Sequence, residues 1–156
     1  MIRRAHLDER AALEALQLRA SLALEDYREA LLAYPDAVAL PACQIEAGNV
    51  LVATEGGLRT GFAAVELHDD GTAELDGLFV EPSRWREGIG SRLADAAANL
   101  AAAAGREMLT VVANPAARDF YERCGFSKTG AVGTRFGPAL LMARRLRPPE
   151  RGRFGT

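Results

Sequence analysis

The chain has 156 residues, of which 49% are hydrophobic, and it carries a formal net charge of -2 at pH 7. A chain of this length is expected to form one domain that removes about 68–70% of its unfolded surface from water, so it holds a core without disulfides. Because both charge signs are interleaved and no basic face or stripe is visible, nucleic acid is not an expected partner.

The cysteines, the histidines and the hydropathy pattern indicate the cellular compartment and limit the chemistry that the chain can perform. The two cysteines, Cys43 and Cys124, lie in dissimilar contexts, and no secretory leader or 18-residue apolar span is visible. We therefore expect a cytoplasmic protein with no membrane partner. His6 and His68 lack metal-ligand spacing, so the sequence predicts no metal site. Cys124 has no histidine close in sequence and is interpreted as a small buried hydrophobe.

In chain order, the first half of the sequence predicts one strand, two helices and then three strands joined by hairpin turns. The first helix has an apolar stripe at Leu13, Leu16 and Leu18. Turn signals at Gly56-Gly57 and at residues 68–71 separate the apolar strands. The elements expected here are a strand at 1–5, a helix beginning near 7, a second helical stretch at about 24–33, one turn at 44–47, and strands at 50–53, 60–67 and 72–80.

The second half predicts a long helix, a strand, a short helix and a final strand. The long helix, residues 91–104, has apolar side chains at intervals of three to four, and Gly105 follows as a helix-ending residue. Its many alanines favour helix and let the helix axis lie close to a sheet. The elements expected after it are a strand at 108–113, a short helix at 115–124 and a strand at 139–146.

This order of elements indicates an α+β fold with a mixed sheet. A single domain is expected over residues 1–146. Residues 147–156 are rich in Pro, Gly and Arg, and we expect them to be a flexible, solvated tail.

The run Arg86-Glu87-Gly88-Ile89-Gly90-Ser91 lies between the strand at 72–80 and the long helix. Its glycines let successive N–H groups converge where the helix presents its positive end, although glycines also serve plain strand-to-helix turns. A Rossmann fingerprint requires a small residue at the position of Leu93, and a P-loop requires Lys where Ser91 stands. The sequence therefore predicts a phosphate cradle of another kind, for a phosphorylated cofactor.

Two segments extend this pattern beyond the glycines. One is the run from Leu75 to Pro82 (LDGLFVEP) that leads into the cradle, and the other is the run from Asn114 to Phe126 (NPAARDFYERCGF). They resemble, in order, the Leu-x-Val-x-Pro strand, the (Arg or Gln)-x-x-Gly-x-(Gly or Ala) loop and the Asn…Ala…Phe-Tyr-Glu…Gly-Phe segment of the GNAT N-acetyltransferase superfamily. The resemblance covers roughly residues 1–146. It implies a mostly antiparallel central sheet, flanked by helices and splayed between its fourth and fifth strands.

The resemblance also implies a reaction. GNAT enzymes move an acetyl group from acetyl-CoA directly to a primary amine, of a small molecule or a protein, with no covalent enzyme intermediate. Where the family most often has Arg or Gln in the loop, this chain has Trp85, whose indole we expect to pack against the neighbouring strand and fix the turn. A homodimer is compatible with a domain of this size.

Cofactor contacts implied by the resemblance fall on three segments. Backbone groups of the strand, opened by a local bulge, would position the thioester, and an N–H at or near Val80 would polarise its carbonyl. Asn114 contacts the pantetheine arm, caps the helix begun by Pro115, or does both. The expected cofactor-binding residues are Leu78, Phe79, Val80, Arg86, Glu87, Gly88, Ile89, Gly90, Ser91, Asn114 and Tyr121.

A base is expected because a lysine-type amine has a reference pKa near 10.4, and presenting it neutral at pH 7 costs about 4–5 kcal/mol. Glu74 and Asp76 are the base candidates, since they are two apart on a strand and nominally share a face, with Gly77 allowing a bulge. Ordinary solvent-facing acids show the same pattern. Glu107 is a weaker candidate, and Glu25-Asp26 could instead select a cationic substrate.

Tyr121 falls on the tyrosine position of the family, seven residues past Asn114. The resemblance implies that it hydrogen-bonds the leaving thiolate, and a core aromatic is the alternative. Proton transfer from a phenol near pKa 10 to a thiolate near 8.5 is uphill by about 2 kcal/mol, so hydrogen bonding matters more than full transfer.

Two other functions fit the same residues. A module that binds CoA without transferring a group is expected if neither Glu74 nor Asp76 faces the acceptor side. A structural oligomer whose glycines only form turns is expected to bind no CoA at all. The acceptor itself is not identified, because residues 35–48 and 134–138, which border its pocket in the family, carry no interpretable pattern.

Overall fold

The computed structural model describes residues 1–23, 39–134 and 137–147. The helix predicted at 24–33, including Glu25 and Asp26, lies outside these residues, as does nearly all of the predicted tail. The described elements are β1 (Ile2–Arg4), η1 (Leu7–Glu9), α1 (Arg10–Leu22), α3 (Ala42–Glu46), β2 (Val50–Glu55), β3 (Leu58–Leu67), β4 (Thr72–Val80), η3 (Pro82–Arg84), α4 (Ile89–Ala103), β5 (Met108–Ala113), η4 (Pro115–Ala117), α5 (Arg118–Arg123), β6 (Ser127–Thr134) and β7 (Gly137–Arg145).

The strands of the described chain form one seven-stranded sheet in the order β1-β2-β3-β4-β5-β7-β6. Neighbouring strands run antiparallel except β4 and β5, which are parallel. The long α4 connects this parallel pair, as a crossover between parallel strands requires. The predicted α+β fold with a mixed, mostly antiparallel sheet flanked by helices is confirmed.

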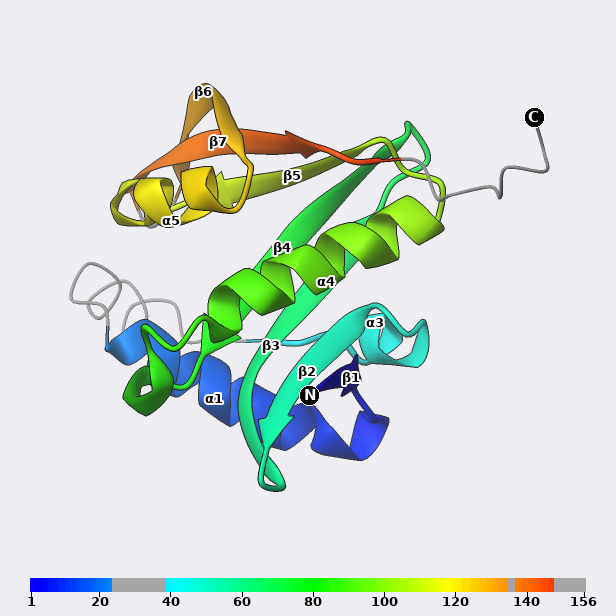
Figure 1. Ribbon diagram of the computed structural model, residues 1–156, viewed down its shortest axis with the longest axis vertical. Helices are drawn as coiled ribbons and strands as arrows, with labels where there is room; N and C mark the ends of the chain where they lie inside the picture. Colours follow the sequence, from blue (N-terminus) through cyan, green and yellow to red (C-terminus); the bar gives the residue numbers. More distant parts are fainter. Residues whose placement is uncertain (24–38, 135–136, 148–156) are drawn as a thin grey trace.

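The sheet opens between β4 and β5. The two strands pair only through residues 72–74 of β4 and 108–110 of β5, and they diverge beyond that point (Figure 1). On the other side of β4, the register with β3 shifts so that Asp76 is an extra residue between Leu75 and Gly77. This bulge lies where Gly77 allows it, and it bends β4 away from β5. The predicted splay between the fourth and fifth strands is therefore present.

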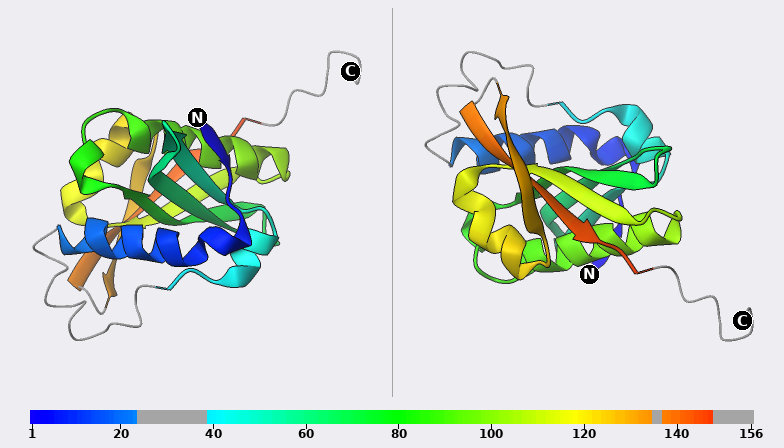
Figure 2. Two further views of the ribbon diagram at one scale, coloured as in Figure 1. Left: turned by 90° about the horizontal axis from the view of Figure 1, so that it is seen from below. Right: turned by 90° about the horizontal axis from the view of Figure 1, so that it is seen from above.

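Helices α1 and α4 cover opposite faces of the sheet (Figure 2). On one face, the alanine-rich side of α4 is fully buried, and its small side chains bring the helix axis close to the strands. On the other face, Leu13 and Leu16 of α1 pack against β2 and β3. The predicted stripe is wrong at Leu18, which is 42% exposed, because the buried face continues at Ala20 instead.

Several elements differ from their predicted ranges, and the differences at α4 and β6 are the ones with a clear cause. Helix α4 begins at Ile89, two residues earlier than predicted, so that the second glycine of the cradle lies inside the helix. Strand β6 has no predicted range, because nearly all of its side chains are exposed and its sequence, SKTGAVGT, lacks an apolar alternation. Among the described helices, none has both the length and the apolar character needed to cross a membrane.

A buried carboxylate joins the N-terminal segment to the sheet. Glu9 is 2% exposed, and its oxygens accept hydrogen bonds from Arg3 (2.8 and 3.0 Å), Arg59 (2.5 Å) and the His6 amide (2.9 Å). The hydrogen bonds from Arg3 hold the pKa of the Glu9 carboxyl well below its usual range. Glu9 thus links β1, the start of α1 and β3 through paired charges.

Candidate functional site

A cavity of about 570 Å³ lies where β4 and β5 separate. Its walls come from residues 75–80 of β4, residues 111–113 of β5, the loop before α4, and the segment around α5. The volume is typical of sites that bind cofactors and small molecules, which span roughly 300–1,000 Å³. The splay therefore brings together the two sequence segments that are far apart along the chain.

The loop between β4 and α4 has an unusual backbone. Arg86 and Gly88 have positive φ angles of 69° and 81°. For a residue with a side chain, such as Arg86, this conformation costs about 1–3 kcal/mol and is common at ligand-binding sites. Two left-handed residues this close together turn the chain sharply toward the start of α4.

Gly88 is the N-cap of α4, and the Arg92 amide donates to its carbonyl oxygen at 3.1 Å. The amides ahead of Arg92 have no acceptor within the helix, as at every helix N-terminus. Residues Gly88, Ile89, Gly90 and Ser91 line the cavity. The site can therefore hold an anion with backbone N–H groups and the positive end of the helix dipole.

The second glycine of the cradle permits close packing. A Cβ at Gly90 would lie 3.1 Å from a ring carbon of Phe120 and 3.7 Å from a methyl of Val80. The N-terminus of α4 therefore lies against both α5 and the end of β4. Only a residue without a side chain allows this approach without moving Phe120.

Charges beside the loop are arranged in pairs. Arg84 donates to Glu87 through Nε at 3.0 and 3.1 Å, and through Nη2 to Glu55. The hydrogen bond from Arg84 lowers the pKa of the Glu87 carboxyl. Glu87 does not line the cavity, whereas Arg86 does. Glu87 therefore braces the loop through Arg84. The cations that line the cavity are Arg84, Arg86 and Arg123.

Trp85 fixes the turn as expected from the sequence. Its indole Nε1 donates to the Val80 carbonyl oxygen at 2.9 Å, and its side chain remains 41% exposed at the cavity wall. The bond satisfies a carbonyl at the end of β4, where the neighbouring strand has diverged.

Tyr121 and Asn114 each have a structural role at the cavity wall. Tyr121 is buried edge-on between Phe120 and Phe126, with ring centroids 5.0 and 5.4 Å away. The Asn114 side chain accepts from the Ala116 amide at 2.9 Å and caps the 3-10 turn that begins at Pro115. Both residues also line the cavity, so the two roles weighed for each are compatible.

The structure separates the base candidates. Asp76, the extra residue of the bulge, lines the cavity, and its Oδ2 accepts from Gln44 Nε2 at 3.3 Å. Glu74 does not line it and instead faces His68, with 3.8 Å between Oε1 and Nε2. Glu107 lies before β5 and is exposed outside the cavity. The two carboxylates remain close to each other, because the charge of Asp76 contributes to raising the pKa of the Glu74 carboxyl.

The structure also adds wall residues that sequence reasoning missed. Ala20 and Ser21, at the end of α1, line the cavity, and Ser21 is buried. Arg19 donates twice to Glu81, at 2.8 Å each, and so ties this end of α1 to the loop after β4. The two partners are 62 residues apart, and no local pattern could have identified them.

The expected cofactor-binding residues are brought to one place. Those that line the cavity are Leu78, Phe79, Val80, Arg86, Gly88, Ile89, Gly90, Ser91, Asn114 and Tyr121. Glu87 is the one expected cofactor-binding residue that does not line the cavity.

Comparison with solved structures gives the same fold. PaiA N-acetyltransferase from Thermoplasma acidophilum, in complex with coenzyme A, has a TM-score of 0.76 at 18% identity over 93% of this chain and 98% of that one. An aminoglycoside 6′-N-acetyltransferase complexed with coenzyme A gives 0.71 at 18% identity, over 95% and 98%. YncA from Salmonella typhimurium, with its cofactor acetyl-CoA, gives 0.70 at 23% identity, over 94% of each chain.

Sequence comparison places the chain in a family. No curated protein matches it. Residues 46–128, more than half of the chain, match the acetyltransferase (GNAT) domain, and this range contains β2 to α5 with both motif segments. The chain therefore belongs to the GNAT acetyltransferase domain family.

Proposed function

We propose that the protein is an N-acetyltransferase that moves the acetyl group of acetyl-CoA directly to a primary amine of a small molecule or a protein. The observation that carries this proposal is the single cavity that joins the cradle, the splayed end of β4 and the Tyr121 segment. Structurally similar proteins bound to coenzyme A or acetyl-CoA support this choice of cosubstrate.

Each wall of the cavity suits one part of the cosubstrate. The amides at 88–91 and Arg86 suit the diphosphate, because they supply N–H donors and positive charge. Beyond the bulge, residues 78–80 of β4 have no β5 partner. Apart from the Val80 carbonyl oxygen, which accepts from Trp85, their backbone groups on that side suit the pantetheine arm and the thioester. Asn114 lies on the opposite wall, at the end of β5.

The transfer forms one bond and breaks one. The amine nitrogen attacks the thioester carbonyl carbon, the C–N bond forms, and the C–S bond breaks with release of the CoA thiolate. The amine loses a proton to a base, and the thiolate is stabilised by a hydrogen bond and is finally protonated. Asp76 is the base we favour, because it lies at the cavity wall, and Tyr121 is the donor to the sulfur.

The base assignment predicts a difference between two neighbouring acids. Asp76→Asn should lower kcat by about 100-fold or more, since general base catalysis contributes about 10²–10⁴-fold. Glu74→Gln, two residues away and outside the cavity, should lower it less than about 10-fold. Steady-state kinetics at saturating acetyl-CoA measure both. The reverse order would assign the base to Glu74.

Tyr121→Phe should lower turnover about 10-fold while leaving acetyl-CoA affinity largely intact. The ring stays between Phe120 and Phe126, so only the hydroxyl is lost. Measuring kcat beside a calorimetric Kd separates the two effects. A wild-type rate would remove Tyr121 from the mechanism.

The reaction itself is tested by thiol release from acetyl-CoA in the presence of a panel of small amines, polyamines and peptides. We expect at least one acceptor to give CoA and an N-acetylated product in equal amounts, identified by mass spectrometry. Tight CoA binding with no turnover across the panel would instead favour a module that binds the cofactor without catalysis.

A further inference from the structure

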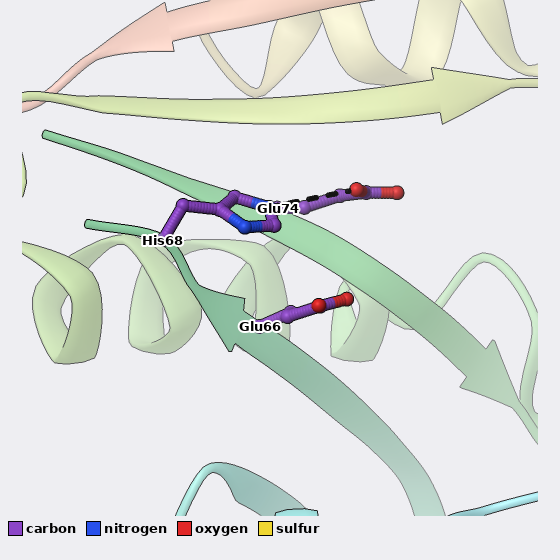
Figure 3. Close-up of side chains that lie close together, drawn as sticks. All are labelled: Glu66, His68 and Glu74. Carbon is purple, nitrogen blue, oxygen red and sulfur yellow. Dashed lines mark ion pairs between the residues drawn. The ribbon is translucent and has the colours of Figure 1, made fainter. Parts of the chain in front are cut away.

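Three ligand-type side chains converge on the sheet outside the cavity. Glu66 of β3, His68 just after β3 and Glu74 of β4 each offer an atom within 4.8 Å of the others. Figure 3 shows a dashed line that joins the His68 ring to the Glu74 carboxylate, with the Glu66 side chain beside them. None of the three lines the cavity, so this cluster is separate from the proposed transfer site.

The β-sheet register creates the cluster. Glu66 and Glu74 are directly paired across the antiparallel strands, and His68 follows Glu66 by two residues, on the same side. The His68 amide donates to the Thr72 carbonyl oxygen at 3.0 Å, so the backbone that carries all three side chains is held by the hairpin. Sequence spacing alone predicts no metal site, because the third group comes from the neighbouring strand.

Among the residues that the structure describes, neither Glu66 nor Glu74 is paired with a lysine or an arginine. Like charges directly opposite on paired strands destabilise a sheet. Burial, followed by the charges of Asp76 and Glu66, raises the pKa of the Glu74 carboxyl, and only His68 acts in the other direction. In the described parts of the chain, all the other ion-paired carboxylates face arginine, namely Glu9, Glu55, Glu81, Glu87, Asp95 and Glu122.

We propose that Glu66, His68 and Glu74 form a binding site for a divalent transition-metal ion, with Zn²⁺ as the best fit. One imidazole nitrogen and two carboxylate oxygens are zinc ligands, and two carboxylates balance the charge of the ion. Three protein ligands leave a fourth position for water. Mg²⁺ fits less well, because it prefers an octahedral set of oxygen ligands.

A metal ion at this position would cross-link strands β3 and β4 just before the bulge that carries Asp76. The ion would replace repulsion between the two glutamates with attraction to a shared cation. A ligand that binds the folded state alone stabilises that state by mass action, so the site should appear as a zinc-dependent rise in Tm.

The test is a calorimetric titration of chelator-treated full-length protein with Zn²⁺, in a Cys43→Ser background that removes the exposed thiol. We expect one ion per chain and a rise in Tm. His68→Asn should weaken binding at least about 10-fold, because losing even a partner outside the metal's direct ligands typically costs 10–100-fold. His6→Asn, the matched change at the only other histidine, should leave binding unchanged.

Glu66→Gln gives a second signature that misfolding cannot imitate. It should raise the Tm of the metal-free protein, because it removes the like-charged pair, and it should abolish the rise in Tm on adding Zn²⁺.

Absence of binding at millimolar Zn²⁺, or binding that His68→Asn and Glu66→Gln leave intact, overturns the proposal. A saturable rise in Tm on adding a diamine, with no rise on adding Zn²⁺, would also overturn the proposal. It would assign the cluster to an organic cation. Because none of the three side chains lines the cavity, loss of zinc binding should leave CoA binding and acetyl transfer unaffected, so this proposal and the proposed function fail independently.

Discussion

Gly88→Val should weaken acetyl-CoA binding about 100-fold or more, because the diphosphate would lose two or more charge-assisted hydrogen bonds worth about 1.5–3 kcal/mol each. Gly88 has φ of 81° at the N-cap of α4, a conformation that a β-branched residue strongly disfavours. Valine would force the turn to reorganise and would move the amides that follow it. Calorimetry measures the loss, and the fluorescence of Trp85, the single tryptophan, provides a second signal from the cavity wall.

The same helix offers a matched control. Gly105 follows the C-terminal end of α4 with φ of 82°, and a Cβ there would meet nothing within 4 Å. Gly105→Val should therefore cost similar folding stability, through the same backbone strain, while CoA affinity stays near that of the native protein. If the two variants lose affinity equally, the effect is one of stability, and the cradle has no special role.

Glu9→Gln should destabilise the fold by about 3 kcal/mol, the lower end of the cost of breaking a buried ion pair, because both arginine partners keep some access to water. The amide has nearly the same shape as the carboxylate, but it carries no charge and leaves the guanidinium groups of Arg3 and Arg59 without their anion. Urea denaturation measures the change. Glu122→Gln removes the exposed pair with Arg118 and should cost at most about 0.5 kcal/mol.

The same carboxylate predicts the acid side of the stability profile. The folded-state pKa of Glu9 is depressed below its ordinary value of 4.5, so the stabilisation is fully present above that pH. It should decline as pH falls below about 4.5 toward the folded-state pKa, because the unfolded chain then binds the proton more readily. The Glu9→Gln variant should show a flatter decline over this range. Equal slopes for the two proteins would contradict the role given to Glu9.

Local chemistry made much of this site predictable. The glycine spacing before α4 indicated a turn that presents backbone amides, and Trp85 was expected to fix that turn against the strand. Strand β4 is observed over the predicted residues, 72–80, because its apolar run and flanking turns agree. These features depend on conformational preferences of a few adjacent residues, which the sequence displays directly.

What could not be predicted depends on register and on long-range contacts. The alternation of Glu74 and Asp76 predicted a shared face, but it could not show that Asp76 lines the cavity while Glu74 lies beside His68. The bond between Arg19 and Glu81 joins positions with no local relation. Strand β6 is stabilised by pairing with β7, and its own residues carry no apolar pattern.

The most direct test of the account is an ¹⁵N NMR titration of the protein with CoA and, separately, with pantetheine, which lacks the diphosphate. If the amides at 88–91 bind the diphosphate, the resonances of Gly88, Ile89, Gly90 and Ser91 should shift strongly with CoA and hardly at all with pantetheine. CoA binding that leaves these four amides unmoved, or no binding at millimolar CoA, would contradict it.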